Sequence, residues 1–408
     1  MRSRGWQRPF LLLAAIVGGA CAGGGGAGAA PGFVGDTVTV GALLPLSDAV
    51  AVIGRPIAIG LQAYAAQVNA RGGIAGRYWL KVLEEDITYA NPSTGAQKYQ
   101  KIKSDVALLA SVVGTDQVNG LLPLLSEDSL IAIPTTFDAE WVRQPNLLPW
   151  GPPYQVWTTV GAAYYLDHGG RGKTICAMTL ATGYGEAALE GLEFASGKLG
   201  FELGVKVTFR QDDQDFVAPI TQLKNGRCDA VFLASLPGVT GKVLGAAAQM
   251  GFEPQWIAQS PAWHSTLLDS PLRDYYRDHL WLLASGTEWG DTTAAGSADM
   301  IEAVSRYAPD QKPDLYASTG YLLGLTAGAL LERALASGDL SRTGLLRALD
   351  GLGTVPYGGL WAEYRYGPPA RREPPRVVSI FRIDPDGPWG VRLLAKDYTT
   401  PAANDLTF

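Results

Sequence analysis

The sequence contains few of the residues from which catalytic and metal sites are built. Its 408 residues include only three histidines and three cysteines, and none lies in a G-x-S-x-G, H-E-x-x-H or C-x-x-C pattern. A serine-hydrolase triad and a zinc site therefore lack their usual sequence support. Because no motif supplies an activated nucleophile or an acid–base pair, we predict that the protein is not an enzyme and needs no metal or cofactor.

An excess of charge of one sign is also missing, as are long hydrophobic runs. There are 33 Lys and Arg against 39 Asp and Glu, a net charge of −6, so a nucleic acid or an anionic membrane surface is not an expected partner. No stretch reaches the roughly 18 uninterrupted apolar residues that a membrane-spanning helix needs. The chain is nonetheless 47% apolar and holds 50 Gly, which predicts a sizeable core built from many short connected elements.

The N-terminal segment has the layout of an export signal. Residues 1–20 place three arginines before a short apolar run that ends in small residues. Cys21 follows, and residues 21–35 form a Gly/Ala-rich tether. We interpret this as a lipoprotein signal with a lipid on Cys21, which would be the only membrane contact; the alternative is ordinary cleavage after residues 27–29. Either way the protein is predicted to be exported to the periplasm or cell envelope.

The other two cysteines, Cys176 and Cys228, lie in and just before apolar, strand-like runs. With no histidine or second cysteine close in sequence, neither resembles a metal ligand or a redox motif. The favoured interpretation is two small buried hydrophobic side chains. The alternative is a disulfide, which an exported protein can keep.

Short apolar runs alternate with amphipathic stretches in two successive arrays, residues 36–150 and 153–285, separated by a Gly-Pro-Pro break. Each array predicts a parallel sheet flanked by helices, so the fold class is α/β with two Rossmann-like lobes. Residues 288–357 are mostly helical and are expected to complete lobe I. Residues 360–398 contain an antiparallel hairpin and are expected to complete lobe II. The chain would thus cross between the lobes three times.

One short motif suggests a nucleotide. Gly183, Gly185 and Ala188 fit the G-x-G-x-x-A pattern between a predicted strand and a predicted helix. The strand after that helix ends without the acidic residue that would bind a ribose, because Arg210 follows Phe209. We therefore do not predict a dinucleotide site.

A binding cleft is predicted between the lobes instead. In open α/β sheets, ligands bind at the carboxyl ends of the strands, where loops converge with helix N-termini. The loops at these ends carry hydroxyls, aromatic rings and one obvious acid, Asp116. They predict a small, mostly uncharged pocket. The loops are residues 45–54, 114–117, 135–138, 181–185, 235–238 and 259–264.

Several stretches resemble one known family. Residues 38–47 (VTVGALLPLS), 68–77 (VNARGGIAGR), 133–136 (IPTT) and 184–186 (YGE) are similar to the periplasmic leucine/isoleucine/valine-type binding proteins. These are type I solute-binding proteins of ABC importers, whose lobes are joined by a three-crossing hinge. The resemblance implies an exported monomer that binds a small amino acid or a related hydrophobic or aromatic carboxylate and delivers it to a membrane permease. The alternative is a ligand-sensing receptor of the same fold that regulates a partner.

The resemblance also implies a set of ligand-binding residues. Hydroxyls of the first lobe would hold the ligand carboxylate, and Tyr184 would close over it. Ser260 and Leu236 replace an acid and a tyrosine that the family often has, so the ammonium of an amino acid would depend on Asp116. For each aromatic residue, packing in the core is the alternative role. The predicted ligand-binding residues are Ile53, Thr115, Asp116, Thr135, Thr136, Phe137, Trp150, Tyr184, Leu236, Ser260, Trp263 and Tyr316.

Overall fold

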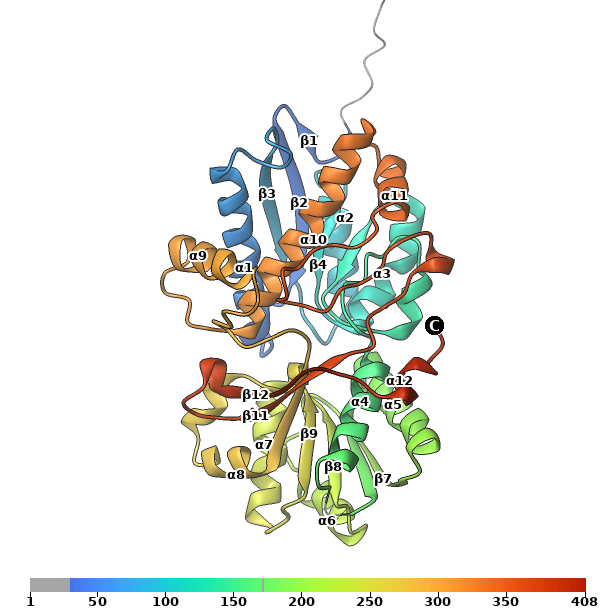
Figure 1. Cartoon of the computed structure of the whole chain (residues 1–408), viewed down its shortest axis with the longest axis vertical. Helices are drawn as coiled ribbons and strands as arrows, with labels where there is room; N and C mark the ends of the chain where they lie inside the picture. The colour runs from blue at the N-terminus through green and yellow to red at the C-terminus, as the bar shows by residue number, and fades with distance from the viewer. Residues whose placement is uncertain (1–29, 171) are drawn as a thin grey trace, which may run out of the picture.

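The computed structural model describes residues 30–170 and 172–408, which form two α/β lobes stacked along the long axis of the molecule (Figure 1). This confirms the predicted fold class. The expected signal segment and Cys21 lie outside the described residues. Phe33 and Val34, which the sequence places in the tether, form strand β1, and Phe33 packs edge-on against Tyr78 at 5.6 Å between ring centroids.

Lobe I is built on a five-stranded sheet. β2 pairs in parallel with β3 and β4, β4 pairs in parallel with β5, and β1 runs antiparallel to β2. The strands are β1 (Phe33–Val34), β2 (Thr37–Leu44), β3 (Trp79–Asp86), β4 (Leu109–Val112) and β5 (Ala132–Pro134). The helices are α1 (Ala51–Ala70), α2 (Pro92–Ile102), α3 (Thr115–Asp128), α9 (Ser297–Tyr307), α10 (Leu315–Ser337) and α11 (Arg342–Asp350).

Lobe II is built on a seven-stranded sheet in the order β12-β11-β10-β9-β8-β6-β7. The neighbours from β10 to β7 pair in parallel, and the C-terminal hairpin of β11 and β12 adds two antiparallel strands. The strands are β6 (Thr174–Leu180), β7 (Glu202–Phe209), β8 (Ala230–Ala234), β9 (Gln255–Gln259), β10 (Leu280–Ala284), β11 (Val378–Ile383) and β12 (Val391–Tyr398). The helices are α4 (Tyr154–Asp167), α5 (Gly183–Leu199), α6 (Val217–Asn225), α7 (Pro237–Gln249), α8 (Arg273–His279) and α12 (Pro401–Asn404).

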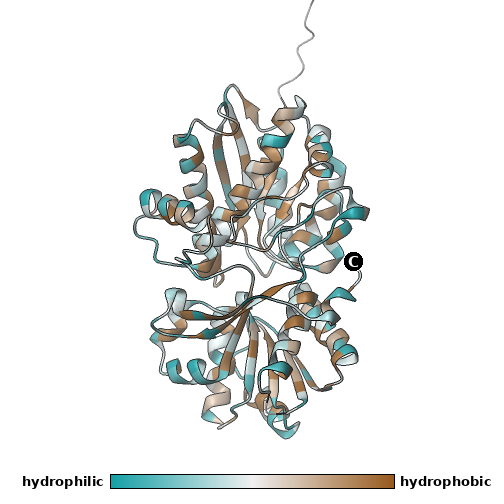
Figure 2. Ribbon diagram, in the orientation of Figure 1, coloured by the Kyte–Doolittle hydropathy of each residue, from teal (hydrophilic) through white to brown (hydrophobic). Residues whose placement is uncertain are grey.

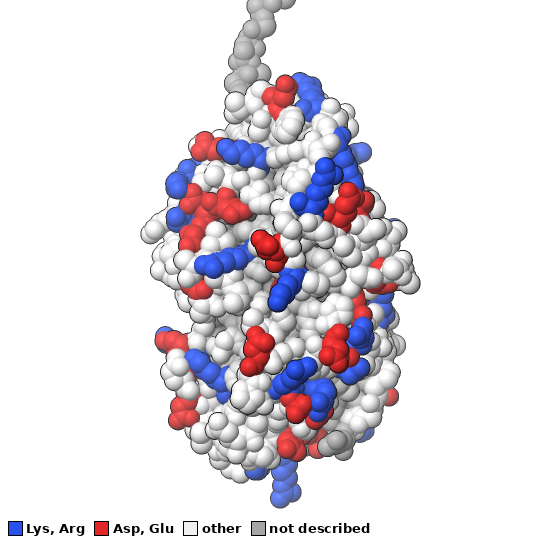
Figure 3. Space-filling model, turned by 90° about the vertical axis from the view of Figure 1, so that its left-hand side faces the viewer, with Lys and Arg blue, Asp and Glu red and all other residues white. Residues whose placement is uncertain are grey.

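The core of each lobe lies between its sheet and the helices on both faces. The central strands are largely apolar, as the brown stretches in Figure 2 show, because a parallel strand covered on both faces has no solvent side. β8 illustrates this, since every residue of Ala230–Ala234 is buried. On the face drawn in Figure 3, acidic and basic side chains are interspersed over both lobes.

Glycines allow α1 and α10 to pack closely. A Cβ at Gly60 would lie 1.9 Å from the carbonyl oxygen of Ala317, and one at Gly320 would lie 2.0 Å from that of Ile57. Any larger residue at either position would push the helices apart. This packing fixes α10, although it is remote in sequence, to lobe I and places its N-terminus at the boundary with lobe II (Figure 1).

The chain passes between the two sheets between β5 and α4, between β10 and α9, and between α11 and β11. Within lobe II, Cys176 and Cys228 form a disulfide with a Cα–Cα distance of 5.7 Å. The favoured prediction of two unbonded side chains was therefore wrong, and the alternative is correct. β6 and β8 are neighbours in the sheet, so Cys176 comes within reach of Cys228, which lies just before β8.

Within the described residues, no helix combines the length and apolarity needed to cross a bilayer.

Candidate ligand-binding site

A cavity lies between the lobes, with a volume of about 60 Å³ available to the centre of a water-sized sphere. None of the described side chains that line it is charged. Lobe I supplies Val50, Ile53, Ile57, Tyr89, Val113, Gly114, Thr135, Thr136, Phe137, Leu315, Tyr316 and Thr319; lobe II supplies Tyr154, Trp157, Tyr184, Leu236, Ser260 and Pro261; and Trp361 comes from the segment between α11 and β11.

Helix N-termini converge on this cavity because α1, α3, α5 and α7 each follow the carboxyl end of a strand. The start of α3 is one of these N-termini. Gly114 precedes it with a φ of 105°, lines the cavity, and provides no side-chain cap. The first N–H groups of a helix have no partner within that helix, so this end of the cavity suits an anion.

Hydroxyl groups form a short network beside the start of α3. The Oγ1 atoms of Thr115 and Thr136 lie 2.8 Å apart, and Thr136 Oγ1 lies 3.2 Å from the hydroxyl of Tyr154. Thr135 Oγ1 lies 2.6 Å from Ser111 Oγ. Since hydroxyls both donate and accept, these groups can reorient to donate to a carboxylate.

Aromatic rings form the wall on the hinge side. The Phe137 ring stacks on Trp157 at 5.5 Å and meets Tyr154 edge-on at 5.6 Å. Trp361 also lines the cavity, stacks on the buried Trp150 at 4.6 Å, and donates its Nε1–H to the Trp150 carbonyl at 3.0 Å. These contacts hold the wall rigid, so an apolar ligand meets a preformed surface.

Tyr184 brings an unsatisfied polar group to the same cavity. The residue is only 2% exposed, and its hydroxyl has no partner with good hydrogen-bond geometry among the described residues. Burial raises the pKa of Tyr184 well above its ordinary value, and the nearby Ser235 backbone offsets part of this effect. A buried hydroxyl without a partner is costly, so this group favours a ligand oxygen as its partner.

Most of the predicted binding residues are brought together around the cavity. Whether they contact a ligand stays a prediction. Those that line it are Ile53, Thr135, Thr136, Phe137, Tyr184, Leu236, Ser260 and Tyr316.

The other predicted residues do not line the cavity. Thr115 lies behind Thr136, and their side-chain hydroxyls form a hydrogen bond. Trp150 and Trp263 are fully buried and donate through Nε1 to backbone carbonyls, so core packing, the alternative considered for each, describes their position. Asp116 points at the other lobe, where its Oδ1 accepts a hydrogen bond from the Gly183 N–H at 2.9 Å.

Several lining residues were not predicted from the sequence. Val113 directly follows β4 and was within reach of the strand-end rule, and Tyr154 and Trp157 lie one turn apart on α4 directly after the Gly-Pro-Pro break. Gly114 lies in the predicted loop 114–117, although it was not among the predicted ligand-binding residues. Trp361 had no such signal. Val50 and Pro261 lie in the predicted loops 45–54 and 259–264, although neither was among the predicted ligand-binding residues. The remaining unpredicted residues are Ile57, Tyr89, Leu315 and Thr319.

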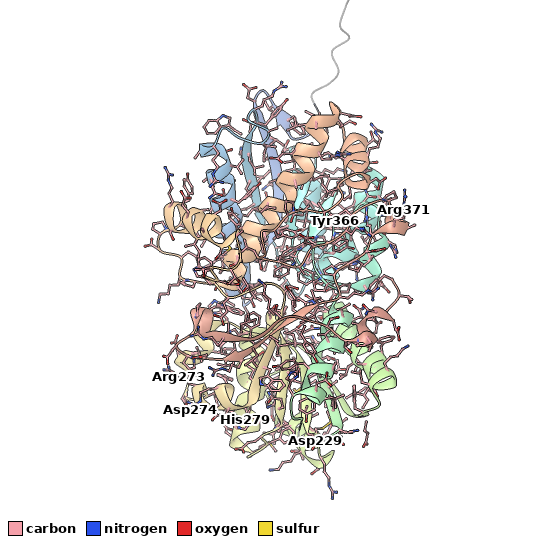
Figure 4. The ribbon with its side chains drawn as sticks, in the orientation of Figure 1. Asp229, Arg273, Asp274, His279, Tyr366 and Arg371 are labelled. Atoms are coloured by element: carbon pink, nitrogen blue, oxygen red, sulfur yellow. A yellow bond between two sulfur atoms is a disulfide. The ribbon has the colours of Figure 1, made fainter. Side chains whose placement is uncertain are left out.

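Two of the three histidines, His168 and His279, lie away from the cavity, and the third, His264, lies 3.5 Å from Asp314 beside the start of α10. His279, on α8, is in the part of lobe II remote from lobe I (Figure 4), and its carbonyl accepts a hydrogen bond from Gln255 at 3.0 Å. His168 ends α4, where its Nδ1 lies 3.0 Å from the Tyr164 carbonyl. Among the described residues, no group of three or more His, Cys, Asp and Glu side chains is placed to hold a metal ion.

Two α/β lobes, crossed three times by the chain and enclosing a cavity, define the type I periplasmic binding protein fold. A family model described as "Periplasmic binding protein" matches residues 37–388, and the chain belongs to this family. No curated protein matches the sequence.

Solved structures share the fold. A fatty acid ABC transporter substrate-binding protein from Thermomonospora curvata superimposes with a TM-score of 0.86 and 21% identity, covering 93% of this chain and 96% of that one. A branched-chain amino acid ABC transporter protein from Thermus thermophilus with bound valine gives 0.76 and 15%, covering 91% and 99%. A leucine binding protein from Thermotoga maritima gives 0.74 and 16%, covering 90% and 99%.

Proposed function

We propose that this protein is the exported solute-binding component of an ABC importer, which holds an amino acid or a related hydrophobic or aromatic carboxylate between its lobes and delivers it to a membrane permease. The single observation behind this proposal is the interlobe cavity, whose apolar and aromatic lining is interrupted only by hydroxyls and helix N-termini. Such a lining suits an organic acid better than a sugar, which needs many polar partners.

The ligand is oriented by the polar end of the cavity. Its carboxylate lies at the start of α3 and receives hydrogen bonds from backbone N–H groups and from the hydroxyls of Thr135 and Thr136. Oriented N–H dipoles offset the hydration that the carboxylate loses, so no buried cation is required. The apolar body of the ligand packs against Phe137 and Trp361.

Closure of the lobes traps the ligand. Hydrogen bonds already cross the cleft on two sides, one between Asp116 and Gly183 and another from the Tyr316 hydroxyl to the Ser260 carbonyl. The three chain passages act as the hinge, and opening them exposes the cavity to solvent. The closed arrangement of the two lobes is then the form that the permease recognises.

The Cys176–Cys228 disulfide supports the exported location in this proposal, because structural disulfides persist in oxidising compartments. A lipid on Cys21 remains a prediction. Intact mass spectrometry of the protein from a membrane fraction would test it, since acylation and cleavage before Cys21 leave a different mass from cleavage after residue 29.

The function is tested by calorimetry and thermal shift with a panel of amino acids, aliphatic acids, aromatic acids and sugars. A ligand that binds only the folded state raises the melting temperature, so at least one carboxylate is expected to stabilise the protein and to bind with one-to-one stoichiometry. Stabilisation by sugars alone, or by no member of the panel, contradicts the proposal.

A further inference from the structure

We infer that the ligand carries a carboxylate but no ammonium group, and that Asp116 acts as a latch between the lobes rather than as a ligand residue. This inference rests on the proposed function and narrows its ligand class. It starts from the hydrogen bonds of the acidic side chains around the cavity, each of which already accepts backbone N–H groups.

Asp48 and Asp314 flank the cavity on the lobe I side. The two oxygens of Asp48 accept from the backbone N–H groups of Val50 and Tyr89, both at 2.8 Å. Asp314 is buried, and its Oδ1 accepts from the N–H groups of Tyr316 and Ala317 at the start of α10, at 2.6 and 3.2 Å. Both carboxylates therefore stabilise backbone turns.

His264 of lobe II lies next to the second oxygen of Asp314. The distance from His264 Nε2 to Asp314 Oδ2 is 3.5 Å. Neither Asp48 nor Asp314 lines the cavity, so neither carboxylate faces a ligand ammonium there.

Asp116 is the acid that the sequence assigned to a ligand ammonium, and it also has a backbone partner. Its Oδ1 accepts the Gly183 N–H at the first residue of α5, across the cleft, and it does not line the cavity. Withdrawing this oxygen toward a ligand would leave the N–H of Gly183 unpaired between the closed lobes, which costs free energy.

Backbone carbonyls do not replace these acids as acceptors for a ligand ammonium. On the lobe II side of the cavity, the carbonyls of Ser260 and Trp263 accept from the Tyr316 hydroxyl. The Tyr154 carbonyl accepts from Thr158 and Gln259. An ammonium in this cavity would thus be buried without a counter-charge, whereas the same ligand lacking the ammonium loses nothing.

Gly183 shows how closely the lobes meet at the latch. A Cβ at this position would lie 2.8 Å from Thr115 Cγ2 and 3.0 Å from Asp116 Oδ1, both in lobe I. There is no room for a methyl group in the closed state. The same substitution is harmless to an open lobe II, because both obstructing atoms belong to lobe I.

Matched ligand pairs test the missing ammonium. Leucine is compared with 4-methylpentanoate, and phenylalanine with 3-phenylpropanoate, by calorimetry on the full protein. In the pair that contains the tighter-binding ligand, the acid without the ammonium is expected to bind at least about 100-fold more tightly than the matching amino acid. The reason is that an unpaired buried charge costs several kcal/mol. An amino acid that binds as tightly as its partner overturns this inference alone. No binding by either pair or by any other carboxylate overturns the proposed function with it.

Two Asp116 variants separate a latch from an ammonium ligand. Asp116→Asn keeps an acceptor for the Gly183 N–H and is expected to bind the acid within about threefold of wild type, whereas Asp116→Ala loses it and is expected to bind about 5- to 20-fold more weakly. If both variants lost affinity equally, and only for amino acids, the Asp116 carboxylate would be a ligand for the ammonium. That result would overturn the latch.

Gly183→Ala tests the latch without touching the carboxylate, and Gly197→Ala is its matched control on the same helix. A Cβ at Gly197 meets nothing within 4 Å. Gly183→Ala is expected to weaken every ligand at least about tenfold by obstructing closure, while Gly197→Ala leaves affinity unchanged. Both variants should keep the wild-type circular dichroism spectrum. Wild-type affinity in Gly183→Ala overturns the inference.

Discussion

The Tyr316 hydroxyl donates to the backbone carbonyl of Trp263 at 2.7 Å, and this bond joins α10 of lobe I to the loop after β9 in lobe II. The same hydroxyl also reaches the Ser260 carbonyl at 2.9 Å. Tyr316 lines the cavity, so a single side chain both contacts the ligand space and links the lobes across it. We therefore expect ligand binding and closure to be coupled through this residue.

Tyr316→Phe should therefore weaken ligand binding. Without the hydroxyl, the Trp263 carbonyl loses its donor in the closed state, while the Ser260 carbonyl keeps the Trp263 N–H. Affinity is expected to fall about 5- to 100-fold, because an unsatisfied buried acceptor costs about 1–3 kcal/mol. Stopped-flow measurement should show the change mainly as faster ligand release.

Tyr275→Phe is the matched control for this change. The Tyr275 hydroxyl donates to the Phe252 carbonyl at 2.5 Å, entirely within lobe II. This variant should lower the melting temperature and leave affinity unchanged. Equal effects of the two variants on affinity would show that the bonds of Tyr316 do not contribute to closure.

Thr135→Val should impair carboxylate binding specifically. The substitution preserves the shape of the side chain but removes the hydroxyl beside the start of α3, so affinity for the best carboxylate is expected to fall about tenfold. Thr221→Val, on the exposed helix α6, removes a hydroxyl bonded only to the Val217 carbonyl and serves as the control. Unchanged calorimetric affinity in Thr135→Val would place the carboxylate elsewhere.

Removal of the disulfide should destabilise lobe II without affecting the site. The cysteines are 52 residues apart, and a loop of that length corresponds to roughly 4 kcal/mol of lost chain entropy in the unfolded state. The Cys176→Ala/Cys228→Ala double variant should unfold at lower urea concentration with unchanged ligand affinity, since the bond lies toward the ends of β6 and β8 that are opposite the cavity. A variant as stable as wild type would contradict this.

Asp138 should make stability depend on pH. Burial raises its pKa to about 6, and the charges of Glu140 and Glu190 add to the effect. The folded state therefore holds this proton more tightly than the unfolded state, so the residue's stabilising contribution is complete below about pH 4 and is lost as the pH rises through about 6.

Asp138→Asn removes this dependence while keeping an acceptor for the Glu140 N–H. The variant is expected to be about 1–3 kcal/mol more stable than wild type at pH 7, with the difference shrinking toward zero near pH 4. Urea unfolding at several pH values measures it, and Asp310→Asn provides an exposed control. If the stability difference between Asp138→Asn and wild type grew as the pH fell, the result would contradict this prediction.

The sequence was sufficient for the fold because the alternation of strands and helices is a local pattern. The strand-end rule likewise located Thr135, Tyr184 and Leu236 at the cavity. It could not locate Trp361, which is brought to the site by the third chain passage rather than by a strand of either array.

Contacts between residues that are far apart in the sequence also could not be predicted, because they depend on how the strands and lobes pack in three dimensions. The bond between Cys176 and Cys228 depends on β6 and β8 being neighbours in the sheet. The partner of Asp116 depends on how the lobes close, so its residue type suggested an ammonium ligand while its position gives it the Gly183 N–H.

Small-angle X-ray scattering with and without the tightest-binding carboxylate tests the central claim most directly. The account predicts that the radius of gyration of the wild-type protein decreases on saturation, that Gly197→Ala behaves identically, and that Gly183→Ala shows no decrease. Saturation of the wild-type site with no change in radius, or equal compaction of Gly183→Ala, would contradict it.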